Sequence, residues 1–144
     1  MRAKKQRVAA YGVCINDKDE ILLARFIARE GRQWILPGGG IDHGEHPHDA
    51  VIREFEEETG FQIEVLRLLG IDSEFREEPD RDYHALRIMY EVRITGGELR
   101  FEVGGTTDMA QWFPLADIGS LDRLSSLDTA LGLYRTTPPA GIMR

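Results

Sequence analysis

The chain has 144 residues, of which 42% are hydrophobic, and this length and composition indicate one globular domain with its own core. Its net charge of −7 argues against direct binding to a nucleic acid backbone or an anionic membrane. No apolar stretch approaches the roughly 18–20 residues needed to span a bilayer. The one cysteine, Cys14, excludes an intramolecular disulfide, so we expect a reducing, cytoplasmic location.

The N-terminal part of the chain is predicted to be built from strands. Residues 7–16 and 20–27 are apolar runs separated by a polar turn, which predicts a hairpin. After a predicted loop at residues 31–33, a short strand at residues 34–36 leads into a glycine-rich loop at residues 37–40. Glycine tolerates positive φ angles and close backbone approach, so this loop is expected to fold tightly.

A helix is predicted next, with signals at both of its ends. Pro47 is favoured at the first helical position, and the helix is expected to end by Thr59 with Gly60 as its left-handed cap. Three apolar residues supply its core stripe: Ala50, Val51 and Phe55.

The C-terminal part is again rich in strands. Strands are predicted at residues 61–71, 84–95, 98–103 and 109–113. The charged stretch 72–82 is either a loop or a ragged edge strand, a second helix is expected at about residues 122–134, and a loose tail follows from Thr136 to Arg144. Runs of strands with two helices favour an α+β fold, an α/β/α sandwich around a mixed sheet.

The last turns of the predicted first helix are unusually acidic. Glu54, Glu57 and Glu58 are spaced so that they share one helix face. An acid near a helix C-terminus costs roughly 0.3–1 kcal/mol, and the like-charge pair Glu54 and Glu58 costs roughly 0.2–0.5 kcal/mol more. Local rules broken together point to function, and a hard divalent cation would supply the missing compensation. The alternative is an ordinary solvated acidic face.

Two further residues fit a site around these acids. Arg53 lies about 100° round the helix from Glu54, where it can pair with a carboxylate and hold its orientation. Glu45, in the loop before the helix, is the candidate partner of Arg53.

These residues together resemble a known family pattern. The order G-x5-E-x7-R-E-U-x-E-E-x-G-U, in which U is a bulky apolar residue, is typical of the Nudix hydrolases. The chain matches it at every fixed position: Gly39, Glu45, Arg53, Glu54, Phe55, Glu57, Glu58, Gly60 and Phe61. The resemblance implies one Nudix domain over residues 1–144, with a core at about 7–134 and an α/β/α sandwich fold with two main helices.

The resemblance also implies a chemistry. A Nudix enzyme uses Mg²⁺, or Mn²⁺, to hydrolyse a pyrophosphate bond by attack of water on phosphorus. The expected substrate is a nucleoside diphosphate derivative of the ADP-ribose, NDP-sugar or (d)NTP class. Glu54 and Glu58 are expected to bind metal directly, and Glu57 to act as ligand or base. Gly38 would add its carbonyl. The alternatives are a catalytically silent, nucleotide-sensing module and an acidic calcium-binding or interaction protein.

The base and the substrate contacts are less defined by the pattern. Nudix enzymes sometimes take their base from outside this pattern, the Nudix box, which spans residues 39–61 here; three acids downstream are candidates: Glu98, Glu102 and Asp108. Trp34 is a candidate for stacking on a base, and His43 for touching a phosphate, whereas Arg25, Arg76, Arg87 and Tyr83 are candidates for phosphate or ribose. Each of these residues alone is more often an ordinary surface or core residue. Many Nudix proteins dimerise, so a homodimer is left open.

Overall fold

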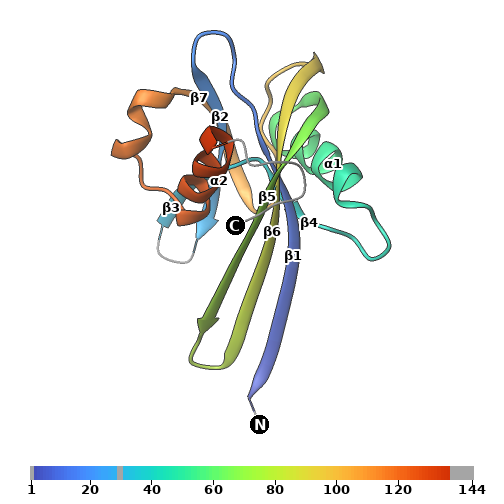
Figure 1. The fold of residues 1–144 in the computed structure, drawn as a ribbon, viewed down its shortest axis with the longest axis vertical. Helices are drawn as coiled ribbons and strands as arrows, with labels where there is room; N and C mark the ends of the chain where they lie inside the picture. The colour runs from blue at the N-terminus through green and yellow to red at the C-terminus, as the bar shows by residue number, and fades with distance from the viewer. Residues whose placement is uncertain (1, 29–30, 137–144) are drawn as a thin grey trace.

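The computed structural model describes residues 2–28 and 31–136 (Figure 1). Its elements are β1 (Ala3–Val13), β2 (Glu20–Ala28), β3 (Gly31–Ile35), β4 (Gly38–Gly40), α1 (Pro47–Thr59), β5 (Phe61–Glu77), β6 (Arg81–Gly97), β7 (Thr107–Pro114), a 3-10 helix (Leu115–Ser120) and α2 (Ser125–Thr136). In this part of the chain no helix combines the length and apolar character needed to cross a bilayer.

The strands form two sheets. One has the order β4-β1-β6-β5 and is mixed, because β1 runs parallel to β6 while its other neighbour, β4, is antiparallel. The other has the order β3-β2-β7 and is antiparallel. The predicted pairing of residues 7–16 with 20–27 is therefore wrong, apart from an isolated bridge between Ile15 and Ile21. The edges of β1 are taken by β4 and β6, and those of β2 by β3 and β7, so β1 and β2 enter different sheets.

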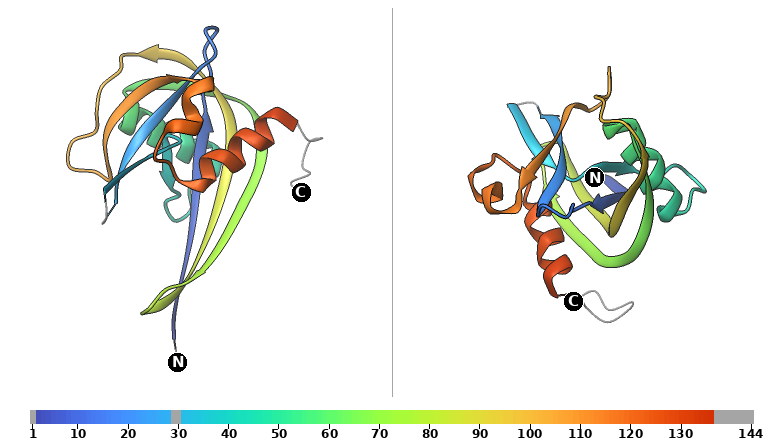
Figure 2. Two further views of the ribbon diagram at one scale, coloured as in Figure 1. Left: turned by 90° about the vertical axis from the view of Figure 1, so that its left-hand side faces the viewer. Right: turned by 90° about the horizontal axis from the view of Figure 1, so that it is seen from above.

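Helices α1 and α2 cover opposite faces of the pair of sheets, as Figures 1 and 2 show. Val13 packs with Leu127 of α2, whereas its neighbour Cys14 packs with Phe55 of α1. Successive strand residues point to opposite faces, so one apolar run serves both cores. The predicted sandwich with a mixed sheet and two main helices is confirmed.

Helix α1 has the predicted bounds and the predicted C-cap. Gly60 has φ 80°, and its N–H donates to the carbonyl oxygen of Glu56. A Cβ at Gly60 would lie 2.1 Å from the carbonyl oxygen of Glu98, so glycine is required there for two reasons. At the other end the His46 side chain accepts a hydrogen bond from the backbone N–H of His48, a cap that the sequence pattern did not reveal.

The charged stretch 72–82 is ordered into strands. Residues up to Glu77 continue β5, and β6 begins at Arg81, so the two form one long hairpin. This hairpin projects from the sandwich together with the first half of β1 (Figure 1). Arg87 forms ion pairs with Asp72 and Glu74 on β5, and such cross-strand pairs allow a charged sequence to form a sheet.

Three other sequence predictions need correction. No strand forms at residues 98–103, because this segment turns along the end of α1, where the Arg100 N–H donates to the carbonyl oxygen of Thr59. Residues 31–33, predicted as a loop, begin β3, and the glycine loop contains the short strand β4. The second helix begins at Ser125 rather than 122, and the predicted tail lies, after Thr136, outside the described residues.

Candidate active site

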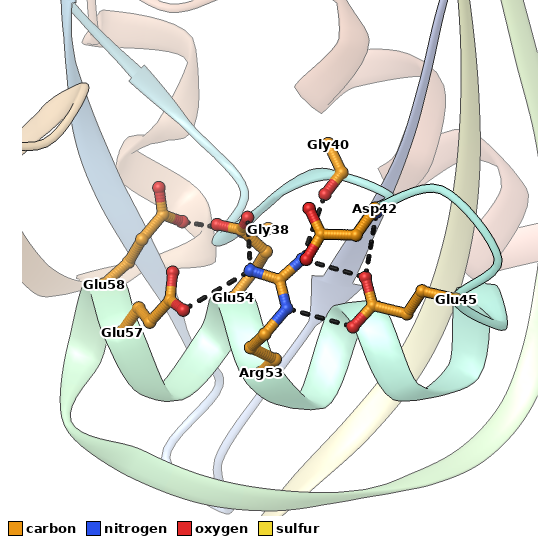
Figure 3. A network of polar contacts seen from close by, with 8 residues as sticks. All are labelled: Gly38, Gly40, Asp42, Glu45, Arg53, Glu54, Glu57 and Glu58. Carbon is orange, nitrogen blue, oxygen red and sulfur yellow. Dashed lines mark hydrogen bonds and ion pairs between the residues drawn. The ribbon is translucent and has the colours of Figure 1, made fainter.

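Arg53 is the centre of a polar network that lies between α1 and the segment of residues 38–45 that precedes it (Figure 3). Its guanidinium makes a two-pronged contact with Glu45, at 3.0 Å from Nε and 2.9 Å from Nη2. Its Nη1 donates to Glu54 at 3.0 Å and to Glu57 at 3.3 Å, and Nη2 donates to the carbonyl oxygen of Gly40 at 3.2 Å. One arginine thus ties the helix to the loop and the glycine strand.

Glu45 is the anchor of this network. Besides Arg53, its carboxylate accepts a hydrogen bond from the backbone N–H of Asp42, which fixes the loop. The hydrogen bonds from Arg53 lower the pKa of Glu45 to about 2, so this carboxylate stays charged and holds the arginine firmly. The predicted contact between Arg53 and Glu45 is confirmed.

Glu58 lies deep in the same region and is only 3% exposed. Its carboxylate accepts a hydrogen bond of 2.7 Å from the backbone N–H of Gly38. Burial raises its pKa well above the usual glutamate value, and the nearby carboxylates of Glu54 and Glu102 raise it further. Within the described residues, no arginine or lysine forms an ion pair with Glu58.

Glu54 is packed against the glycine strand. A Cβ on Gly39 would lie 2.7 Å from the Glu54 carboxyl group, so only glycine leaves room for this side chain. Burial raises the pKa of Glu54, although the hydrogen bond and charge of Arg53 oppose that shift. The close fit explains why the box begins at a glycine.

Glu57 is the most open of the three acids, at 46% exposed side-chain area. Figure 3 shows Glu54, Glu57 and Glu58 along one side of α1, with Arg53 beside them. Across the described residues, no three acidic, histidine or cysteine side chains already stand close enough to form a complete metal cluster. The three acids therefore share one face of α1, but their carboxylates are not yet close enough together to surround a metal ion.

The chemistry of this donor set fits a hard divalent cation. It offers carboxylate oxygens and a backbone carbonyl, and Mg²⁺ and Mn²⁺ prefer oxygen ligands. Two of its acids, Glu54 and Glu58, have raised pKa values because they are buried and close to other carboxylates. A cation would relieve both causes, because it would supply opposite charge where water is excluded.

The three candidate bases outside the helix lie in different surroundings. Glu102 accepts a hydrogen bond from the Thr107 hydroxyl at 3.2 Å and raises the pKa values of Glu54 and Glu58, so it belongs to the same cluster. Asp108 is bound by Arg25 and Arg32, which lower its pKa to about 2. Glu98 is exposed and contributes its backbone carbonyl near Gly60.

The candidate substrate residues are divided among three places. Arg25 and Trp34 are neighbours on the second sheet, where the Arg25 guanidinium lies 5.8 Å from the Trp34 ring centre, and Trp34 also packs edge-on against Phe113. Tyr83 lies on the long hairpin between Arg76 and Arg81, and His43 is exposed in the loop before α1.

A cavity of about 700 Å³ opens between the hairpin and the second sheet. Arg76 and Arg81 line it from the hairpin, and Phe26, Arg32 and Gln33 line it from β2 and β3. Arg32 was not identified from the sequence, because its partner Asp108 is 76 residues away and only the sheet brings the two together. The cavity brings arginines from two separate chain segments around one space, together with the acids Glu78 and Asp122.

Comparisons with known proteins agree with this architecture. An ADP-ribose pyrophosphatase from Methanocaldococcus jannaschii is 34% identical over 116 residues, which cover 79% of this chain and 65% of that protein. A human diphosphoinositol polyphosphate phosphohydrolase is 38% identical over 113 residues, covering 78% of this chain and 60% of that protein. The chain therefore spans less than two thirds of the length of either relative.

A solved Nudix hydrolase from Nitrosomonas europaea has the same fold, with a TM-score of 0.80 at 23% identity, covering 94% of this chain and 93% of that one. The model of the NUDIX domain matches residues 5–131. Since that match includes both sheets, the intact box and most of α2, the chain belongs to the Nudix family.

Proposed function

We propose that this chain is a divalent-cation-dependent pyrophosphohydrolase that cleaves the anhydride of a nucleoside diphosphate derivative by attack of water on phosphorus. The observation that carries the proposal is the buried carboxylate of Glu58, raised in pKa beside Glu54 and without a basic partner in the described structure. An isolated buried charge is unfavourable unless something pairs with it. A cation that arrives with the substrate is such a partner.

Four groups would hold that cation: the carboxylates of Glu54, Glu57 and Glu58 and the carbonyl of Gly38. When bound, it supplies charge neutralisation on the phosphoryl oxygens and lowers the pKa of water. Mg²⁺ is the first choice because all four groups are hard oxygen donors, and Mn²⁺ is the alternative.

The chain's own residues provide order and a proton acceptor. Arg53, held by Glu45, keeps Glu54 and Glu57 on one side of α1, which fixes the ligands before substrate binds. Glu57 and Glu102 are the best placed to accept the proton of the attacking water. Glu57 is open to solvent, and Glu102 belongs to the carboxylate cluster without contacting Arg53.

The substrate proposal rests on the cavity and on the relatives. The cavity is bordered by three arginines, Arg32, Arg76 and Arg81, against two acids, Glu78 and Asp122, so it offers guanidinium groups to an anionic substrate in a protein that is acidic overall. One relative is named for ADP-ribose and another for diphosphoinositol polyphosphates, both compounds with a diphosphate. We therefore place ADP-ribose first, with NDP-sugars and (d)NTPs next.

The test is a product-resolved assay with purified protein, Mg²⁺ or EDTA, and ADP-ribose, UDP-glucose and dATP as substrates. We expect AMP and ribose 5-phosphate from ADP-ribose, only with the metal present. In water labelled with ¹⁸O, the label should appear in one phosphate product. Equal product formation in EDTA, or no product from any of the three with either Mg²⁺ or Mn²⁺, would contradict the proposal.

A further inference from the structure

Arg7 of β1 is a half-buried cation without an acidic partner. Its Nη1 lies 3.2 Å from the hydroxyl oxygen of Tyr11, and within residues 2–28 and 31–136 it forms no ion pair with a carboxylate. Arg53 and Arg87, which are also partly buried, each bind two or more carboxylates. A guanidinium removed from water with only a phenol beside it retains donors for an anion.

The guanidinium lies against the glycine strand of the site. A Cβ on Gly40 would be 3.6 Å from Nη2 of Arg7, which is ordinary contact distance. Gly39, the preceding residue, faces the carboxyl group of Glu54. Successive strand residues face opposite sides of a sheet, so Arg7 and Glu54 lie on opposite faces of the glycine strand β4. Arg7 is thus a single strand away from the proposed metal ligands.

The charge of Arg7 is maintained by its neighbours. Burial lowers its pKa, but Tyr11, Tyr83 and the carboxylate of Glu54 outweigh this effect and leave the pKa above the ordinary arginine value. The side chain therefore stays cationic at every pH at which the protein is folded. It acts as a fixed positive charge beside a cluster of acids.

Arg7 also faces the cavity side of the first sheet. Lys5 is opposite Tyr83 and Arg7 is opposite Ala85, so Arg7 and Tyr83 are on the same face of the sheet. Tyr83 carries the guanidinium groups of Arg76 and Arg81, at 4.9 and 5.2 Å from its ring centre, and both arginines line the cavity of about 700 Å³. Arg7 thus lies on the face of the sheet that carries Tyr83 and, through it, Arg76 and Arg81; those two arginines are paired with Glu78, whereas Arg7 is not paired with a carboxylate in the described residues.

We propose that Arg7 binds an oxyanion of the substrate's diphosphate and that Tyr11 positions its guanidinium; this inference rests on the proposed function. An arginine can donate two parallel hydrogen bonds to one phosphate group. Because β4 is the edge strand of its sheet, a diphosphate lying along that edge would meet the metal ligands on one face and Arg7 on the other. Arg7 makes this contact in the ground state, so it chiefly affects binding.

The test compares Arg7→Gln and Arg7→Lys with the wild type in steady-state kinetics on ADP-ribose with Mg²⁺. Losing a charge-assisted contact should raise KM about 10- to 100-fold, while turnover changes by less than about threefold. Arg7→Lys should lie between, because it keeps the charge but loses the two-pronged geometry. Arg93→Gln is the matched control, since Arg93 is an exposed arginine that pairs with Glu64.

Calorimetry with the α,β-methylene analogue of ADP-ribose provides a second readout that needs no turnover. Binding should weaken in Arg7→Gln as much as KM rises, and Arg93→Gln should bind as the wild type does. Unchanged KM and unchanged analogue affinity in folded Arg7→Gln would overturn the inference. If that variant does not fold, Arg7→Lys decides by the same two measurements. An inactive wild type whose analogue binding still depends on Arg7 would refute the proposed function and leave this inference standing.

Discussion

The molecule contains two acidic centres, Asp108 and Glu58, that differ in whether an arginine forms an ion pair with them. Asp108 of β7 is gripped by Arg25 at 2.9 and 3.2 Å and by Arg32 at 2.6 Å, and its pKa falls to about 2. Glu58 of α1 accepts a hydrogen bond from the Gly38 N–H but is paired with no cation of the described residues, and its pKa rises well above normal. The fold thus already neutralises Asp108 but leaves Glu58 without a cation in the described residues.

The arginine of the helix shows how this difference arises. The Nε and Nη2 groups of Arg53 both donate hydrogen bonds to Glu45. Only Nη1 contacts Glu54 and Glu57, so the positive charge of Arg53 is shared among three acids. Glu58 is left outside the network of Arg53. The fold therefore holds Glu54 and Glu57 in place through Arg53 but supplies no arginine or lysine charge to Glu58 among the described residues.

The largest effect should come from removing the unpaired charge. Glu58→Gln keeps the shape and an acceptor for the Gly38 N–H, but it removes a proposed metal ligand, so we expect turnover of ADP-ribose to fall about 10²–10⁴-fold. The metal-free protein should melt at the same or a higher temperature, because an unfavourable buried charge has gone. Initial rates and thermal denaturation in EDTA measure the two effects.

Glu56→Gln is the control for this variant, because it changes the same kind of side chain on the same helix outside the Arg53 network. It should have wild-type activity and stability. Wild-type turnover in Glu58→Gln, or a large loss of stability without metal, would remove the distinction between the two acidic centres.

The pH dependence of the free energy of unfolding should also distinguish the unpaired acids from the acids that are paired with arginine. The folded-state pKa values of Glu58 and Glu54 are raised, so the folded protein keeps protons that the unfolded chain has released. Their contribution therefore makes metal-free protein less stable as pH rises from about 4.5. Asp108 and Glu45, with pKa values of about 2, contribute stability that is lost as pH falls below about 4.

Urea denaturation of EDTA-treated protein from about pH 3 to 8 measures both limbs. Glu58→Gln should flatten the decline on the alkaline side, and saturating Mg²⁺ should do the same in the wild type. An alkaline limb that is identical in wild type and Glu58→Gln would show that Glu58 does not titrate as its surroundings imply.

The smallest effect on activity is expected for the paired centre. Asp108→Asn breaks two ion pairs at a partly exposed position, so the melting temperature should fall by a few degrees, roughly 2–5 °C, while turnover stays within about threefold of the wild type. Steady-state kinetics beside thermal melting checks this. A hundredfold or greater loss of turnover, the size expected for losing a general base, would instead assign Asp108 to that role and remove Glu57 and Glu102 from it.

Local spacing was enough to predict the helix and its acidic face. Pro47 and Gly60 set the ends of α1, and the intervals between Glu54, Glu57 and Glu58 set their shared face, because both depend only on helix geometry. The contact of Arg53 with Glu45 was predictable for the same reason, since only a short loop and two helical turns separate them. The roles of these residues in binding metal stay predictions.

Only the tertiary structure decided which charges are neutralised. Asp108 meets Arg25 and Arg32 across two strand pairings, and Arg7 reaches Gly40 because β1 and β4 are adjacent in the sheet. Likewise, the charged residues 72–77 and 81–82 lie in strands, where Arg87 pairs across the hairpin with Asp72. Sequence periodicity specifies which way a side chain points but not which strand becomes its neighbour, since pairing is set by the packing of the whole chain.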